Sequence, residues 1–194
     1  MHDILVKVVD NALAAYMSYC RKSCAKTLEK VVSLILGCHS GGHKLEFFGV
    51  GTSGIVKQDA QRKFSRLGIY AQACTDVVLQ AMGAALLRPS DCMVVISNSG
   101  RSREMLAVAI IAKRNGVAVV AICASGSPLA QLADYHLAAD HTENFEFYVP
   151  MVSRLMHLLV IDVLATCVAM GMGYENLLPL LTEAKHSLYN KLYL

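Results

Sequence analysis

Apolar and polar positions along the middle of the chain predict strands and helices in regular alternation. Short apolar runs at 45–49, 70–73, 93–96, 117–123 and 135–138 are typical of strands, and the stretches between them carry apolar residues at helical spacing. The run at 93–96 is apolar throughout, as expected of a strand that is buried on both faces. Strands alternating with helices predict an α/β fold with a five-stranded parallel sheet and helices on both of its faces.

Helices are expected both between the strands and at the two ends of the chain. Two apolar stripes before the first strand predict an N-terminal pair of helices, and the residues of these stripes are Leu5, Val8, Ala12, Ala15 and Tyr19, then Leu28, Val31, Ile35 and Leu36. Interior helices are predicted at 54–67, at 76–87 with Asp76 as N-cap, at 103–114, and from Pro128 onward, and terminal ones at 150–170 and 174–190.

The chain lacks a Pro/Ser-rich linker, so a single domain over residues 1–194 is predicted. It divides into two N-terminal helices at 1–43, an α/β core at 44–140 and C-terminal helices at 150–192. A hydrophobic fraction of 55% supplies ample material for a core. The formal net charge is only +3 and the basic residues are spread along the chain, which argues against nucleic-acid binding by these residues alone.

Seven cysteines, an odd number, are expected to be free thiols in a reducing compartment, so the chain is predicted to be cytoplasmic. The Cys20 and Cys24 pair and the group of Cys38, His39 and His43 lack the spacing of zinc motifs, and neither a metal nor a cofactor is expected.

The apolar stretch Met151 to Met170 is the one candidate for a membrane span. It contains Arg154, His157 and Asp162, which would cost several kcal/mol together in a bilayer. A buried core helix or a subunit contact is therefore predicted there, with no membrane partner.

One local design occurs twice. KLEFFGVGTSG at 44–54 and DCMVVISNSGRS at 91–102 each lead from an apolar run into glycine and small hydroxyl residues, and then into a predicted helix. Backbone amides at a helix start carry partial positive charge and lack partners within the helix, so such turns suit a phosphate. The candidate ligand contacts are Gly51, Thr52, Ser53, Ser97, Asn98, Ser99 and Ser102.

The two turns follow the first and the third predicted strand. In the common strand order 2-1-3-4-5 these strands are neighbours, and the chain reverses direction between them, which opens a crevice at their carboxyl ends. Both turns would then face one ligand. In any other strand order the two turns would lie apart and could not share a ligand.

Two other interpretations of these turns remain open. Gly49, Gly51 and Gly54, followed by Asp76, match the dinucleotide fingerprint, although Asp76 is equally well explained as a helix cap and the second turn would have no role. The residues 97–100 are also ordinary turn formers that need no ligand.

The motifs GVGTSG and ISNSGRSREM, with DAQRKFSRLG after the first, resemble the sugar isomerase (SIS) domain. This phosphosugar-binding module occurs in aldose–ketose isomerases and in bacterial regulators of the RpiR type. The resemblance implies a three-layer α/β/α fold, and it implies sugar-phosphate contacts at Ser53, Ser97, Ser99 and Ser102, with Thr52 and Asn98 between them. The late segment YVPMVSRLMHLLVIDVLAT looks most like the HexR-type regulators, which respond to 2-keto-3-deoxy-6-phosphogluconate.

An isomerase would need a general base. The candidates are Glu143 and Glu146, with His136, His141 and His157 near them in sequence, but a solvated acidic loop and a helix histidine facing a partner explain them more simply. Glu104 is likewise explained by the helix dipole.

A binding module rather than an enzyme is therefore predicted, with a sugar phosphate as ligand. Homo-oligomers, dimers or tetramers, are expected to form through the helices near 151–170 and 4–19. The resemblance to regulators implies DNA contact only through a helix-turn-helix domain that these residues do not include.

Overall fold

The computed structural model describes residues 1–141, 152–173, 175–179, 181–183 and 186. Five parallel strands form one sheet in the order β2-β1-β3-β4-β5, which confirms the predicted fold class and strand order. The strands are β1 (Leu45–Phe48), β2 (Ala71–Gln72), β3 (Cys92–Ser97), β4 (Ala118–Cys123) and β5 (Tyr135–Ala138). The helices are α1 (His2–Lys22), α2 (Ala25–Ser40), α3 (Gly51–Arg66), α4 (Val77–Leu86), α5 (Arg103–Arg114), α6 (Pro128–Leu132) and α7 (Val152–Met172).

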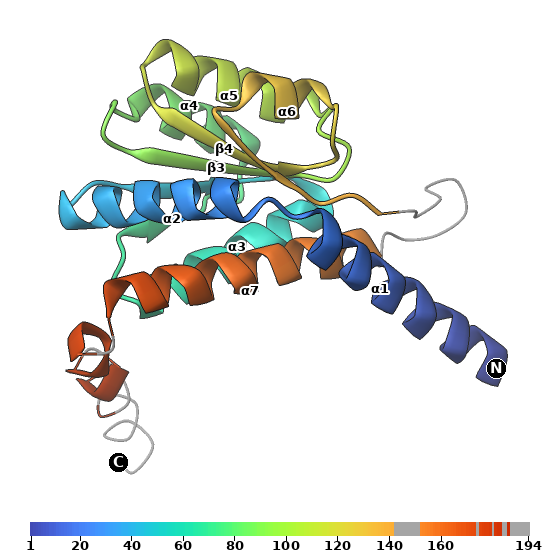
Figure 1. Ribbon diagram of the computed structural model, residues 1–194. Helices are drawn as coiled ribbons and strands as arrows, with labels where there is room; N and C mark the ends of the chain where they lie inside the picture. Colours follow the sequence, from blue (N-terminus) through green and yellow to red (C-terminus); the bar gives the residue numbers. More distant parts are fainter. Residues whose placement is uncertain (142–151, 174, 180, 184–185, 187–194) are drawn as a thin grey trace, which may run out of the picture.

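The helices lie in two layers, one on each face of the sheet (Figure 1). Helices α2, α3 and α7 cover one face, and α4, α5 and α6 cover the other. Strand β3 illustrates why the sequence folds this way, because its alternate side chains enter opposite layers: Val94 and Ile96 pack on the α3 and α7 side, and Met93 and Val95 on the α5 side. Each such fully buried side chain contributes about 1.5–3 kcal/mol.

Helix α7 is long and apolar enough to cross a membrane by length and composition. In the fold it is a core helix, with Met156, Val160, Leu164 and Val168 buried. Its partner is chiefly α3, to which it is also linked by an ion pair between Asp162 and Lys63. Of the two roles predicted for this stretch, a core helix or a subunit contact, the core helix agrees with this packing.

Helix α1 leaves most of its apolar stripe exposed within the chain. Only Ala15 is buried, whereas Leu5 is 61% exposed and Leu13 is 54% exposed. Figure 1 shows the reason, since the N-terminal part of α1 extends away from the sheet and contacts the body of the domain mainly at α7. An apolar stripe at helical spacing identifies the helix but does not say what covers the stripe.

Helix α3 begins at Gly51, three residues before the predicted start at Gly54. Glycine disfavours helix interiors by about 1 kcal/mol, so the two glycines hid the first turn from the pattern. Thr52 and Ser53 therefore belong to the first turn of the helix. The last predicted helix, 174–190, is helical at 175–179 and 181–183, and its remaining residues lie outside the described ones, except His186.

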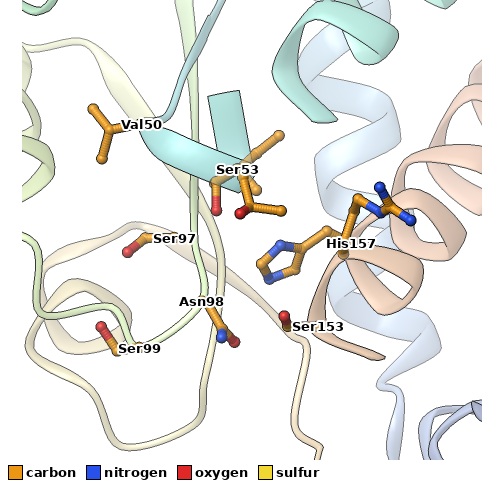
Figure 2. Close-up of a pocket in the computed structure, with 10 residues that line it drawn as sticks. Val50, Ser53, Ser97, Asn98, Ser99, Ser153 and His157 are labelled. Carbon is orange, nitrogen blue, oxygen red and sulfur yellow. The ribbon is translucent and has the colours of Figure 1, made fainter. Parts of the chain in front are cut away.

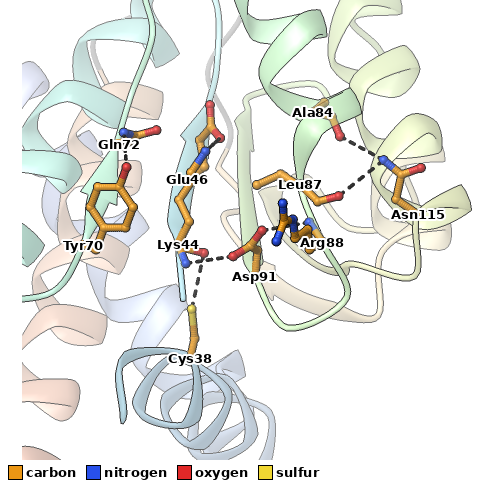
Figure 3. A network of polar contacts seen from close by, with 10 residues as sticks. All are labelled: Cys38, Lys44, Glu46, Tyr70, Gln72, Ala84, Leu87, Arg88, Asp91 and Asn115. Atoms are coloured by element: carbon orange, nitrogen blue, oxygen red, sulfur yellow. Dashed lines mark hydrogen bonds and ion pairs between the residues drawn. The ribbon is translucent and has the colours of Figure 1, made fainter. Parts of the chain in front are cut away.

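A polar network holds the amino ends of β1 and β3, at the end of the sheet opposite the predicted site (Figure 3). The Asp91 carboxylate accepts hydrogen bonds from the backbone N–H of Lys44 at 2.9 Å and of Arg88 at 2.8 Å, and the Cys38 thiol donates to the Lys44 carbonyl at 3.3 Å. The side-chain amide of Asn115 donates to the carbonyl of Ala85 at the end of α4. These bonds hold β1, β3 and their helices in register, which fixes where their carboxyl ends emerge.

Candidate functional site

The turn between β1 and α3 is built for close approach. A Cβ added to Gly49 would lie 3.0 Å from the Ser53 carbonyl oxygen and 3.1 Å from that of Ile96, so a larger residue would force α3 and the end of β3 apart by a few tenths of an ångström. The Gly49 N–H donates to the buried Gln80 side chain at 3.1 Å. The N-cap residue of α3 is Val50, whose apolar side chain cannot cap the helix. The first-turn amides of α3 consequently keep their partial positive charge.

The turn between β3 and α5 is held from behind by the next crossover. The Asn98 carbonyl accepts from the Ala124 N–H at 3.1 Å, and the Gly100 carbonyl accepts from the Leu129 N–H at 3.1 Å. Gly100 has a φ of +62°, in the left-handed region that favours glycine. These two bonds tie the turn to the β4–α6 connection, and its residues Ser97, Asn98 and Ser99 line the cavity described next.

These two turns meet at one cavity of about 310 Å³ (Figure 2). Thr52 and Ser53 line it from α3, and Ser97, Asn98 and Ser99 line it from the end of β3. The crevice expected at adjacent strand ends is therefore present. Ser53 is 8% exposed and Ser97 is 6% exposed, and neither hydroxyl is hydrogen-bonded by any described residue. Both hydroxyls are free to bond a ligand.

Helix α7 supplies the opposite wall, which the sequence argument missed as part of the site. Ser153, Arg154 and His157 line the same cavity. Ser153 and His157 are one helical turn apart and so lie on one face of α7. The available indication was a set of polar residues at helical spacing in an otherwise apolar helix, but nothing in the pattern said that this face meets the two turns.

The cavity favours an anion. The described residues that line it include no carboxylate, while the α3 amino end and the Arg154 guanidinium both contribute positive potential. His157 is 1% exposed, and burial, assisted by the nearby His141, lowers its pKa from 6.5 to about 4. Its ring is therefore neutral at pH 7.

Two of the seven predicted contacts are not among the residues that line this cavity. Ser102 is the N-cap of α5, where its hydroxyl accepts from the Met105 N–H and donates to Glu104 at 2.6 Å. Gly51 lines a second cavity of about 240 Å³ on the other side of α3, next to Lys57, whose ammonium donates to the Cys74 carbonyl. A serine directly before a helix is a common cap, so the role of Ser102 had a local indication.

The residues of the alternative interpretations have other roles in the structure or lie outside its described part. Asp76 caps α4 by accepting from the Leu79 N–H at 2.9 Å and lines neither cavity, so its role as the acidic residue of a dinucleotide site has no support. Among the described residues no group of three or more His, Cys, Asp or Glu side chains could hold a metal ion. Glu143 and Glu146 lie outside the described residues. His136 bonds the Cys123 carbonyl at 3.0 Å, and His141 bonds the Asn98 side chain at 2.6 Å.

Comparison with known proteins agrees with the fold described above. Residues 41–167 match the SIS domain family. The bifunctional protein glk of Burkholderia orbicola is 40% identical over 174 residues, which is 90% of this chain and 26% of that protein. The HTH-type transcriptional regulator HexR of Pseudomonas aeruginosa is 36% identical over 182 residues, 94% of this chain and 62% of HexR. This chain thus spans about a quarter of the first relative and less than two thirds of the second.

Among solved structures, the NanR protein of Vibrio vulnificus, complexed with ManNAc-6P, superposes with a TM-score of 0.86 at 23% identity. The match covers 96% of this chain and 69% of NanR, and at this identity it establishes a shared fold.

Proposed function

Because the chain belongs to the SIS domain family, we propose that it is the phosphosugar-binding effector domain of a bacterial transcriptional regulator of the RpiR/HexR type. The observation that carries this proposal is the cavity between α3 and the β3–α5 turn, where the unbonded hydroxyls of Ser53 and Ser97 lie beside the uncapped start of a helix. Such an arrangement offers several donors to one phosphate without a compensating negative charge.

The relatives support a regulatory role. HexR is named as a helix-turn-helix transcriptional regulator, and this chain aligns with 62% of its length. We infer that DNA contact is made by a helix-turn-helix domain outside the residues described here. Ligand binding would reach that domain only if the ligand favours one arrangement of the subunits over another. The resemblance to HexR makes 2-keto-3-deoxy-6-phosphogluconate the first ligand to test.

We further propose a cytoplasmic location, which all seven cysteines support as free thiols. Cys38 and Cys92 are buried in the core, and burial raises the pKa of the Cys38 thiol to about 11. Such thiols are protonated at neutral pH and serve as small apolar side chains.

Isothermal titration with a panel of phosphorylated sugars and sugar acids tests the proposal. The native protein should bind one of them with a micromolar dissociation constant. A hydrogen bond to a charged group contributes about 1.5–3 kcal/mol, so the double variant Ser53→Ala, Ser97→Ala should lose about 100-fold or more in affinity. Ser33→Ala is the matched control, because the Ser33 hydroxyl is exposed and bonds only the Glu29 carbonyl of its own helix.

Unchanged affinity in the double variant would refute the site. Steady conversion of an aldose phosphate into a ketose phosphate by the purified protein would replace the sensor with an isomerase. Binding of NAD without binding of any phosphosugar would favour the dinucleotide interpretation.

A further inference from the structure

Three described side chains have a buried polar atom without a hydrogen-bond partner, and His157 is the one of them that lines the proposed phosphate site. Its side chain comes from α7 and lines the 310 Å³ cavity, yet the residue is only 1% exposed. Its Nε2 atom is buried and has no hydrogen-bond partner among the described residues. Figure 2 shows the ring directed into the space that Ser53 and Asn98 border from the other side.

An unpartnered imidazole nitrogen in this position is unfavourable for the free protein. More than nine in ten buried polar groups in folded proteins have a partner, because desolvation without a replacement bond destabilises the fold. The other histidines near the site follow this rule, with His136 bonded to the Cys123 carbonyl and His141 to the Asn98 side chain. The exception at His157 is accounted for if the ligand supplies the missing partner.

The chemistry of the partner follows from the charge state of the ring. The groups around it that carry or change charge are Arg154 on α7 and His141 from the segment after β5, and the other lining side chains from α3 and the β3–α5 turn are neutral. Burial and His141 hold the pKa of His157 near 4, so the ring is a neutral imidazole with one donor and one acceptor nitrogen. A neutral ring matches a hydroxyl group, which also donates and accepts, better than it matches a second anion.

We propose that His157 hydrogen-bonds a hydroxyl group on the sugar portion of the ligand and thereby selects phosphosugars by the presence and position of that hydroxyl. This proposal rests on the proposed phosphosugar function and places the phosphate and the sugar of the ligand at different walls of the cavity. The start of α3, together with Ser53 and with Ser97 at the end of β3, binds the phosphate. His157 on α7 contacts the sugar. A site built to bond a hydroxyl rejects analogues that lack it, because its own polar atom is then left buried and unpaired.

The assignment leads to two opposite effects of one substitution. His157→Leu removes the unpartnered nitrogen at similar volume, so the melting temperature of the ligand-free protein should rise by about 3 °C. The same variant should bind the native phosphosugar about 10- to 100-fold more weakly, and inorganic phosphate within about twofold of the native protein. His157→Gln, which keeps an amide near the Nε2 position, should recover part of the phosphosugar affinity.

His136→Leu is the matched control, since it removes a histidine whose nitrogen has a partner. This variant should lower the melting temperature. If His157→Leu also lowers it, the unpaired state of His157 in the free protein is wrong and the inference fails.

The two binding measurements, with phosphosugar and with inorganic phosphate, distinguish a failure of this inference from a failure of the proposed function. A native protein that binds no phosphosugar overturns the proposed function. Native binding that His157→Leu leaves unchanged overturns only the role of His157. An equal loss of phosphosugar and inorganic phosphate also overturns it, because His157 would then act on the phosphate end.

Discussion

Replacing Gly100 by alanine should reduce both the stability of the fold and the affinity of the site. Gly100 lies in the β3–α5 turn with φ at +62°, where an L-residue is strained by about 1–2 kcal/mol. An added Cβ would also lie within 2.6 Å of the Ser127 Cβ and closer still to its hydroxyl oxygen. Overpacking of this kind costs about 1–3 kcal/mol, so the total loss in the free energy of unfolding should be about 2–5 kcal/mol.

Gly126→Ala separates the two contributions. Gly126 has a φ of +68°, but a Cβ there would meet nothing within 4 Å, so this variant carries the backbone strain without the collision. It should lose only about 1–2 kcal/mol. Urea unfolding followed by circular dichroism measures the free energy of unfolding of both variants. The slope of this free energy against urea concentration should stay unchanged, which checks that only stability has changed.

The collision also predicts a coupling. Ser127→Gly alone removes the side-chain cap of α6, whose oxygen accepts from the Ala130 N–H at 3.2 Å, but in the Gly100→Ala background it also relieves the clash. The double variant should therefore lose less than the sum of the two single losses. If Gly100→Ala costs no more than Gly126→Ala, or if the two losses simply add, the close packing of this turn on Ser127 does not determine its conformation.

Two further outcomes follow from the structure. Because burial and His141 lower the pKa of His157 to about 4, the unfolded chain binds more protons between pH 6.5 and 4, and His157 should remove about 3 kcal/mol of stability over that interval as the pH falls. Subtracting the curve of His157→Leu from that of the native protein isolates this contribution, and a flat difference would contradict it. The exposed apolar side chains of α1, Leu5 and Leu13 among them, predict a dimer or larger oligomer in sedimentation at micromolar concentration. Lysine at both positions should shift the population toward monomer, and a native protein that is already monomeric would refute the prediction.

Subunit contacts were predicted on the helices near 151–170 and 4–19, and the two helices differ in how much of their apolar surface the chain itself covers. Much of α7 packs against α2 and α3 within the same chain, while α1 keeps its apolar face open. Exposed apolar residues also occur on α4, where Val78 is 67% exposed and Leu86 is 72% exposed, which the pattern did not single out.

The hydrophobic pattern by itself determined the elements and their class. The apolar run of β3 fills both layers of the core, and Asp76 caps α4 as expected, because strand burial and helix capping depend on residues that are neighbours in sequence. The two glycine- and serine-rich turns were also identifiable locally, since each is defined by the strand before it and the helix after it. Their convergence needed a strand order, and the prediction assumed one common arrangement of such sheets.

Only the tertiary structure decided which side chains share the cavity. Ser102 carries the same hydroxyl as Ser99 but is turned into the cap of α5, and Ser53 reaches the cavity because α3 begins earlier than its glycines suggested. His157 lies about a hundred residues after Ser53 in the chain, and its position in the cavity follows from how α7 packs on α3. Packing of that kind depends on the shapes of many side chains at once, so no local pattern specifies it.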